Sequence, residues 1–183
     1  MLERSKEYQK RCKEVCSDVE YEMLEKAFFD KESNLRKQRG FVVMDLIKIQ
    51  KFIKKQKVSF ICSIDENGFP NIKAMLKPRK INGLKEFYFS TNTSSLRVKQ
   101  FLSNPNASIY FYRKGLIKYT GVMLVGKMEV LTDQETKNMI WKKGDTIFYK
   151  KGVTDPDYCV LKFTAQNGRY YCDLKTESFV LEI

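Results

Sequence analysis

The sequence predicts an α+β protein in which an antiparallel β-sheet closes into a barrel, with helices flanking the sheet. Three observations lead to this expectation. Segments with alternating apolar and polar residues, typical of strands, recur from residue 58 onward, about six in number. Segments with apolar residues at three- and four-residue steps, typical of helices, precede and interrupt them. Gly121 and Gly126, inside one long strand, indicate the bulges that curve a sheet.

The N-terminal 40 residues are expected to form a helical extension and a linker, followed by one domain over residues 41–183. Apolar residues at helical spacing predict a long amphipathic helix from about Glu3 to Phe29. The polar segment 30–40 is the expected linker. A second amphipathic helix is predicted from about Met44 to Lys55.

The remaining chain reads as strands separated by turns and two further helices. Strands are predicted at residues 58–64, 69–76, 86–90, 107–112, 118–131, 158–163 and 169–174, with a last short strand at 179–181. The pair Asn67-Gly68 predicts a hairpin turn because both residues accept positive φ. A second pair, Asn167-Gly168, predicts another turn. Asp133 is expected to cap a helix that carries Trp141.

Composition limits the chemistry that the side chains can perform. The chain has 183 residues, a net charge of +12 and no histidine, so it lacks the usual general base near neutral pH. We therefore expect a cofactor to supply most of the chemistry, so we name no catalytic side chain, and we predict no metal site. The five cysteines form no CxxC pair, and no segment reaches the roughly 20 apolar residues that cross a bilayer. These features predict a soluble, cytoplasmic protein without membrane contact.

The positive charge is concentrated in one part of the chain. Residues 1–30 carry six basic and eight acidic side chains, whereas residues 31–57 carry nine basic and two acidic ones. On the predicted helix the lysines lie opposite the apolar stripe, which favours a solvated helix face. Binding of an anionic partner is the alternative. These lysines are Lys48, Lys51, Lys54, Lys55 and Lys57.

The segment 87–100 carries the most specific pattern. It places several hydroxyl side chains at the start of a helix that is predicted to follow Ser94 or Ser95 and to end near Ser103. Arg97 lies one step inside this helix. The helix dipole, the free backbone N–H groups and the guanidinium all favour an anion, which indicates a phosphate site. An ordinary capped surface helix explains the same residues, and this segment alone does not separate the two.

The order of these elements resembles the pyridoxamine phosphate oxidase superfamily of split β-barrels that bind flavin mononucleotide (FMN), in particular its general stress protein branch. The resemblance covers about Met44 to Asp173. It rests on the lead-in helix, the strand–turn–strand over 59–70, the segment 87–111, the strand 126–130 and the segment 155–164. It implies an FMN-binding split barrel over residues 41–183 that works as a homodimer, with FMN at the subunit interface.

The resemblance also implies which residues bind the cofactor. The basic residue after the proline of the second strand, Lys73, would reach the flavin phosphate. Its neighbours Ala74 and Met75 would lie along the isoalloxazine edge, and Ser90 and Thr91 would contact the phosphate and the ribityl chain. The full set is Lys73, Ala74, Met75, Ser90, Thr91, Ser95 and Arg97.

Two positions depart from the family pattern. Ser95 and Arg97 match the serine and the second basic residue of the family's Ser-Arg-Lys signature, but Leu96 stands where the first cation is expected. This implies weaker phosphate binding or a substitute cation, for which Lys77, Arg79 and Lys80 are candidates. The C-terminal segment 176–183 has neither the arginine nor the histidine that bind the pyridoxal ring in the true oxidases, so we do not expect oxidation of vitamin B6.

The function implied is that of an FMN-dependent oxidoreductase or reductase acting on an unidentified small molecule, with NAD(P)H as a candidate electron donor. The alternative is a split barrel that binds nucleic acid or another anionic partner through its basic surface, with flavin as a sensor or lost; nucleic acid is the less expected partner. A deazaflavin or a haem is a third option, and the lack of histidine argues against haem.

Overall fold

The computed structural model describes residues 46–115 and 119–181. The chain divides into two compact units, Met1–Ile47 and Lys48–Ile183, and the second unit carries the sheet. The predicted helix from Glu3 to Phe29, the linker and the domain boundary near residue 40 lie outside the described residues and stay predictions. Within the described residues, no helix is long and apolar enough to cross a lipid bilayer.

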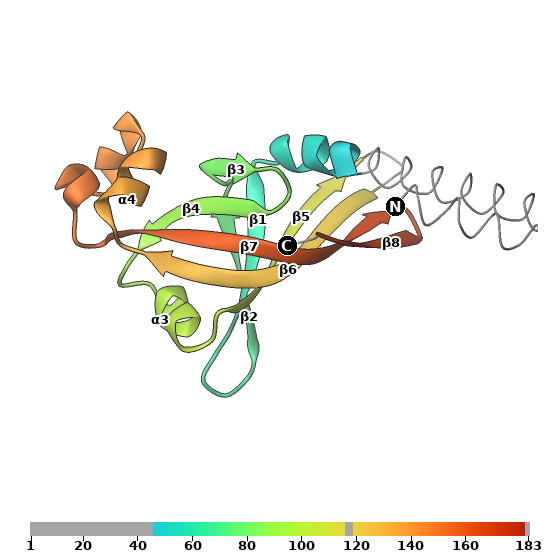
Figure 1. Ribbon diagram of the computed structural model, residues 1–183, viewed down its shortest axis with the longest axis horizontal. Helices are drawn as coiled ribbons and strands as arrows, with labels where there is room; N and C mark the ends of the chain where they lie inside the picture. Colours follow the sequence, from blue (N-terminus) through green and yellow to red (C-terminus); the bar gives the residue numbers. More distant parts are fainter. Residues whose placement is uncertain (1–45, 116–118, 182–183) are drawn as a thin grey trace, which may run out of the picture. The chain divides into compact units, whose positions relative to one another are not determined.

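An eight-stranded antiparallel sheet forms the body of the second unit (Figure 1). Seven strands follow the order β2-β1-β5-β6-β7-β4-β3, and β8 pairs with β7 beside this path. The strands are β1 (Val58–Ile64), β2 (Pro70–Leu76), β3 (Lys80–Asn82), β4 (Glu86–Asn92), β5 (Asn106–Lys114), β6 (Tyr119–Leu131), β7 (Tyr158–Cys172) and β8 (Lys175–Val180). Among the described strands the end strands β2 and β3 do not pair, so the sheet is not closed. The predicted α+β class with an antiparallel split barrel is confirmed, whereas full closure of the sheet is not observed.

The first hairpin forms as the sequence predicts. The Asp65 side chain accepts hydrogen bonds from the backbone N–H groups of Asn67 and Phe69 at 2.9 and 2.8 Å, and Gly68 takes a φ of 84°. β1 and β2 then pair in register from Val58 opposite Leu76 onward. The bulge expected near Gly126 is also present, because the register of β6 against β7 shifts between Val125 and Gly126.

In the described residues, three helices and two short 3-10 helices accompany the sheet. Residues 46–54 form a helix whose apolar side chains Ile49, Phe52 and Ile53 are buried while its lysines are exposed. The helix α3 (Leu96–Ser103) follows β4, with Ser95 at its N-cap. The helix α4 (Gln134–Ile140) begins after Asp133, whose side chain accepts a hydrogen bond from the Thr136 N–H as predicted. The 3-10 helices are η1 (Lys143–Ile147) and η2 (Gly152–Thr154).

The turn predicted at Asn167-Gly168 is wrong. β7 runs through both residues without interruption, and the chain instead reverses after β7 at Asp173, which has a φ of 56°. Gly168 serves close packing, because a Cβ there would lie 2.5 Å from the ring of Phe179 in β8. The glycine therefore makes room for a neighbouring strand, and β8 is longer than the short last strand that the sequence suggested.

The two faces of the curved sheet differ in burial. The inner face carries the core, in which Ile61, Ile109 and Leu124 are fully buried. The outer face of the hairpin leaves large apolar side chains in solvent: Phe60, Ile72 and Leu76 are 36%, 71% and 69% exposed. Ile72 lies opposite Cys62 in the register, and Phe60 lies opposite Ala74. Because paired residues and residues two apart in a strand share a face, Phe60 and Ile72 lie on the same side of the hairpin.

Candidate functional site

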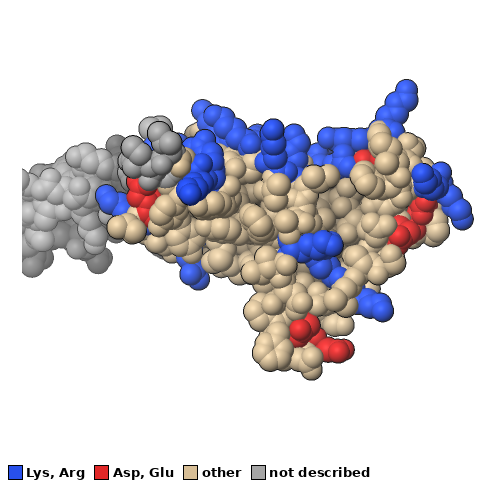
Figure 2. All heavy atoms as spheres, turned by 180° about the vertical axis from the view of Figure 1, so that it is seen from behind, with Lys and Arg blue, Asp and Glu red and all other residues tan. Residues whose placement is uncertain are grey.

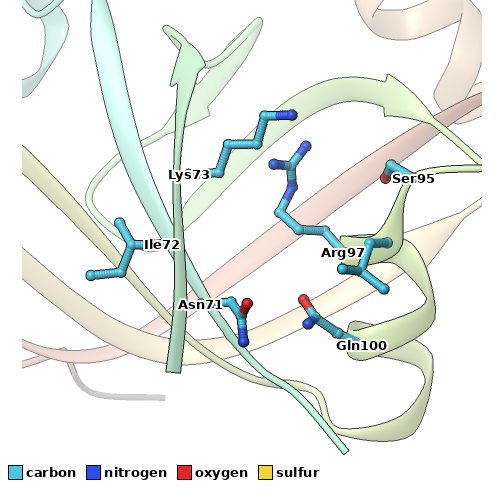
Figure 3. A pocket seen from close by; sticks show the side chains of 7 residues that line it. Asn71, Ile72, Lys73, Ser95, Arg97 and Gln100 are labelled. Carbon is cyan, nitrogen blue, oxygen red and sulfur yellow. The ribbon is translucent and has the colours of Figure 1, made fainter. Parts of the chain in front are cut away.

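A hollow of about 220 Å³ lies between the edge strand β2 and the first turn of α3 (Figure 3). We call it the cationic pocket. Its lining residues are Asn71, Ile72, Lys73, Ser95, Leu96, Arg97 and Gln100. Two segments more than twenty residues apart in the sequence therefore build one site.

The strand β2 supplies one wall of the cationic pocket. Lys73 lies opposite Ile61 in the register of the β1–β2 hairpin, so it shares the inner face of the sheet with a core residue. Asn71 lies on the same face two positions earlier, whereas the Ile72 side chain points away from the pocket (Figure 3). Because side chains alternate between the two faces of β2, the Lys73 ammonium group and the Asn71 amide both lie on the side of α3.

The helix α3 supplies the facing wall. It begins after Ser95 because β4 ends in a polar turn, and it buries Val98 and Phe101 against the sheet. This anchoring turns the Arg97 side chain toward β2, where its guanidinium lies beside the Lys73 ammonium group (Figure 3). No acidic side chain lines the pocket.

Two buried polar atoms in the cationic pocket have no hydrogen-bond partner among the described residues: Oγ of Ser95 and Nε of Arg97. Burial also lowers the pKa of Arg97, because loss of water disfavours the charged form. A buried donor without an acceptor costs about 1–3 kcal/mol, and more when it is charged. The site is therefore arranged to receive an acceptor that this chain does not itself provide, and an anion satisfies both donors.

Buried amide and hydroxyl groups fix the base of the cationic pocket. The Ser63 hydroxyl of β1 donates to Oε1 of Gln100 at 2.6 Å, and both side chains are buried. Asn71 donates through Nδ2 to Oδ2 of Asp65 at 3.0 Å. These bonds tie α3 to β1, and β2 to the hairpin turn, so the two walls keep their spacing.

The structure brings together three of the predicted site residues: Lys73, Ser95 and Arg97 line the same pocket. Met75 shares the inner face of β2 with Lys73, whereas Ala74 lies on the opposite, exposed face. The structure thus places three of the five residues predicted at the phosphate in one location.

Ser90 and Thr91 do not line the cationic pocket. The Ser90 hydroxyl accepts a hydrogen bond from Nε of Arg79 at 3.3 Å, and Thr91 is buried with its carbonyl near Sγ of Cys159. The candidate substitute cations Lys77, Arg79 and Lys80 do not line it either.

Arg79 has a structural partner instead. Its guanidinium pairs with the buried carboxylate of Asp145 at 2.5 Å, which joins the segment before β3 to η1. Lys80 lies with its Nζ 2.9 Å from Sδ of Met139. None of the three candidates therefore replaces the missing first cation of the Ser-Arg-Lys signature in this pocket, whose described cations are Lys73 and Arg97.

Asn71 and Gln100 are site residues that sequence reasoning missed. A signal existed for each, because Asn71 precedes Lys73 by two positions on a strand and Gln100 follows Arg97 by three on a helix. Those spacings place them on the same faces as the cations.

Comparison with known proteins gives consistent matches. The family model described as pyridoxamine 5'-phosphate oxidase matches residues 46–172. A pyridoxine/pyridoxamine 5'-phosphate oxidase from Agrobacterium fabrum (strain C58) is 31% identical over 77 residues, which cover 41% of this chain and 34% of that protein. The chain thus matches about a third of the length of this curated relative.

Solved structures extend the match over most of the sheet. The crystal structure of a Clostridium acetobutylicum protein related to general stress protein 26 of B. subtilis is 41% identical, with a TM-score of 0.66, covering 74% of this chain and 94% of that chain. General stress protein 26 from Bacillus anthracis str. Sterne is 20% identical, with a TM-score of 0.61, covering 74% of this chain and 98% of that chain. The second likeness shows the fold alone.

Proposed function

Because the chain belongs to the pyridoxamine 5'-phosphate oxidase family, whose members usually bind a flavin, we propose that the cationic pocket binds the phosphate of FMN. The protein would then act as an FMN-dependent oxidoreductase on a small molecule. The observation that carries this proposal is the pair of orphaned donors on Ser95 and Arg97, which face the Lys73 side of one hollow.

The chemistry of the donor set fits a phosphate dianion. A phosphate offers several acceptor oxygens, which Nε of Arg97 and Oγ of Ser95 require. The charges of Lys73 and Arg97 balance the two negative charges, and the start of α3 adds its dipole. A carboxylate carries one negative charge and would balance only one of the two cations, so the pair of cations favours a phosphate dianion.

In this proposal the protein's own residues bind and orient the cofactor. Lys73 and Arg97 would hold the phosphate end, while Ala74 and Met75 continue along β2 from Lys73 and would border the isoalloxazine edge through backbone hydrogen bonds. Ser90 and Thr91 would contact the ribityl chain from the end of β4. The bound flavin would supply the electron-transfer chemistry, and the protein would tune it through hydrogen bonds and charge.

We further propose that the protein is a homodimer with FMN at the subunit interface. Leu96 lines the cationic pocket and is 67% exposed, and the outer face of the β1–β2 hairpin carries the exposed Phe60, Ile72 and Leu76. Exposed apolar side chains that adjoin one another mark contact surfaces. A second copy of the chain would cover them and complete the wall of the site.

The remaining parts of the proposal concern substrate and location. NAD(P)H is the proposed electron donor, and the proposed substrate is a small molecule. The three described cysteines, Cys62, Cys159 and Cys172, form no disulfide, which supports a reducing compartment, the cytoplasm.

The experiment is reconstitution of the purified protein with FMN and, separately, with riboflavin, which lacks the phosphate. We expect the flavin absorption bands to be retained after gel filtration with FMN and to be lost with riboflavin. The same column reports whether the protein elutes as a dimer. Protein that retains neither flavin, or that retains both equally, contradicts a phosphate-based site. Absorption bands of haem or deazaflavin in freshly purified protein would show that one of those cofactors, and not FMN, is bound.

A further inference from the structure

A second cationic surface lies away from the cationic pocket, around the C-terminal end of the helix at residues 46–54. We call it the basic patch and define it by its members, which are Lys51, Lys54, Lys55, Lys57, Lys77 and Arg113. All of them are exposed. The function proposed above uses none of them.

Backbone and ring contacts bring these side chains together. The Lys77 N–H donates to the Lys57 carbonyl oxygen at 2.9 Å, which joins the end of β2 to the end of the helix. The Arg113 guanidinium carbon lies 5.7 Å from the centroid of the Phe52 ring, which joins the end of β5 to the same helix. Three segments that are distant in sequence therefore contribute cations to one surface.

The described segments that build the basic patch contain no counter-charge. The segments that build it, residues 46–64, 76–81 and 110–115, include no aspartate or glutamate. Within the described part of the chain, none of its side chains forms an ion pair. Figure 2 shows lysine and arginine side chains gathered along the upper edge of the molecule, where acidic side chains are nearly absent. Neighbouring cations repel one another, and a bound polyanion offsets this repulsion.

The burial pattern of the helix selects among polyanionic partners. Ile49, Phe52 and Ile53 are 3%, 9% and 1% exposed, so the apolar stripe is already used by the core. A helix that binds a membrane surface needs that stripe free to enter the lipid, and a stable protein interface needs an apolar centre. The outward side of this helix carries mostly solvated cations, which suit a phosphate backbone, and Ile47, 47% exposed, is the one large apolar side chain that its described residues leave in solvent.

We propose that the basic patch binds the phosphate backbone of nucleic acid without reading its sequence. The six cations can contact up to six phosphates, which corresponds to a slope of about −5 in a plot of log affinity against log salt for duplex DNA. Affinity would fall about a thousandfold between about 50 and 200 mM salt. This inference does not depend on the flavin proposal, because Lys73 and Arg97 are not part of the basic patch.

The test measures fluorescence anisotropy of a labelled DNA duplex of random sequence, about 20 base pairs long, over a salt series with the full-length protein. The patch variant carries Lys51→Gln, Lys54→Gln and Lys55→Gln. The control variant carries Lys127→Gln, Lys150→Gln and Lys175→Gln, three exposed lysines elsewhere that give the same net charge. FMN retention reports that both variants are folded, and circular dichroism does so if the protein binds no flavin.

Each lost phosphate contact removes about 0.9 from the magnitude of the slope of log affinity against log salt. We therefore expect a slope smaller by about 3 in the patch variant. The control variant should keep most of the slope of the unaltered protein. Equal losses in the two variants would show that net charge alone attracts DNA, and the inference would be wrong. Absence of DNA binding by the unaltered protein at about 50 mM salt would also overturn it, as would binding to phosphatidylserine vesicles without binding to DNA.

Discussion

Replacement of Arg97 by glutamine tests the cationic pocket most directly. The substitution removes the charge and the orphaned Nε donor and retains a side chain of intermediate length. Arg97 is half-buried and contacts no acidic partner among the described residues, so the substitution breaks no ion pair there. The folded protein should therefore tolerate it, and any loss of cofactor should come from the site itself.

The expected magnitude follows from the contact that is lost. A hydrogen bond to a charged group contributes about 1.5–3 kcal/mol, and each 1.4 kcal/mol is tenfold in affinity. We therefore expect FMN to bind Arg97→Gln about 10- to 150-fold more weakly. Stability without ligand should stay equal or rise, because the uncompensated burial that lowers the pKa of Arg97 is removed.

The assay is a titration of flavin fluorescence with unaltered protein, Arg97→Gln and a matched control, Lys99→Gln. Lys99 lies two residues further along α3, is exposed and does not line the cationic pocket. Each protein is titrated with FMN and with riboflavin. Affinity should fall only in the titration of Arg97→Gln with FMN, because riboflavin has no phosphate to contact the guanidinium. Equal weakening of both flavins, or equal effects of both substitutions, would refute the placement of the phosphate.

Three further predictions concern stability. Gly168→Ala should lower the free energy of unfolding by about 1–3 kcal/mol in urea titrations, because the new Cβ would lie 2.5 Å from a ring atom of β8; Gly144→Ala, with nothing within 4 Å of its Cβ, should change it little, and similar effects of the two would contradict the packing argument. Asp145→Asn should cost about 3 kcal/mol in the same titration, because it leaves its arginine partner without a counter-charge; an unchanged midpoint would show that solvent compensates. Burial raises the pKa of Tyr149 and of Tyr158 from 10.0 to about 12, so the folded form holds these protons more tightly than the unfolded chain. Stability should be complete below pH 10 and fall as the pH rises toward about 12; chemical unfolding at constant ionic strength that shows no such fall would contradict their burial.

Local signals made much of the fold predictable from the sequence. The hairpin β1–β2 was predicted with its turn because Asn67-Gly68 has a strong intrinsic preference and both strands alternate clearly. The ends of α3 were predicted because Ser95 and Asn104 bracket an amphipathic segment. The capping hydrogen bond that such a serine usually makes is not observed, because Oγ of Ser95 makes no hydrogen bond to the helix. The position was predictable from residue type, whereas the orientation of the hydroxyl depends on the pocket.

Signals that depend on neighbouring strands were not predictable in the same way. Asn167-Gly168 has the same residue types as the first hairpin turn but lies inside β7. The difference comes from Phe179, which packs against the bare Gly168 backbone from a strand that is adjacent only after folding. A single sequence does not reveal that contact. The inclusion of Ser90 and Thr91 followed from the resemblance, and the structure gives them partners outside the cationic pocket.

The position of the cationic pocket follows from the incomplete closure of the sheet. Ile61 and Lys73 lie side by side on the same face of the β1–β2 hairpin, yet Ile61 is fully buried and Lys73 is exposed. The difference arises because β2 is an end strand and, among the described strands, does not pair with β3. In a closed barrel the inner face at this position would be apolar, since an unpaired buried ammonium group is costly. The open seam lets one lysine face inward and remain hydrated, with Arg97 of α3 opposite it. The same seam that leaves an edge strand unpaired therefore allows two cations to face one another, and a bound dianion would stabilise both.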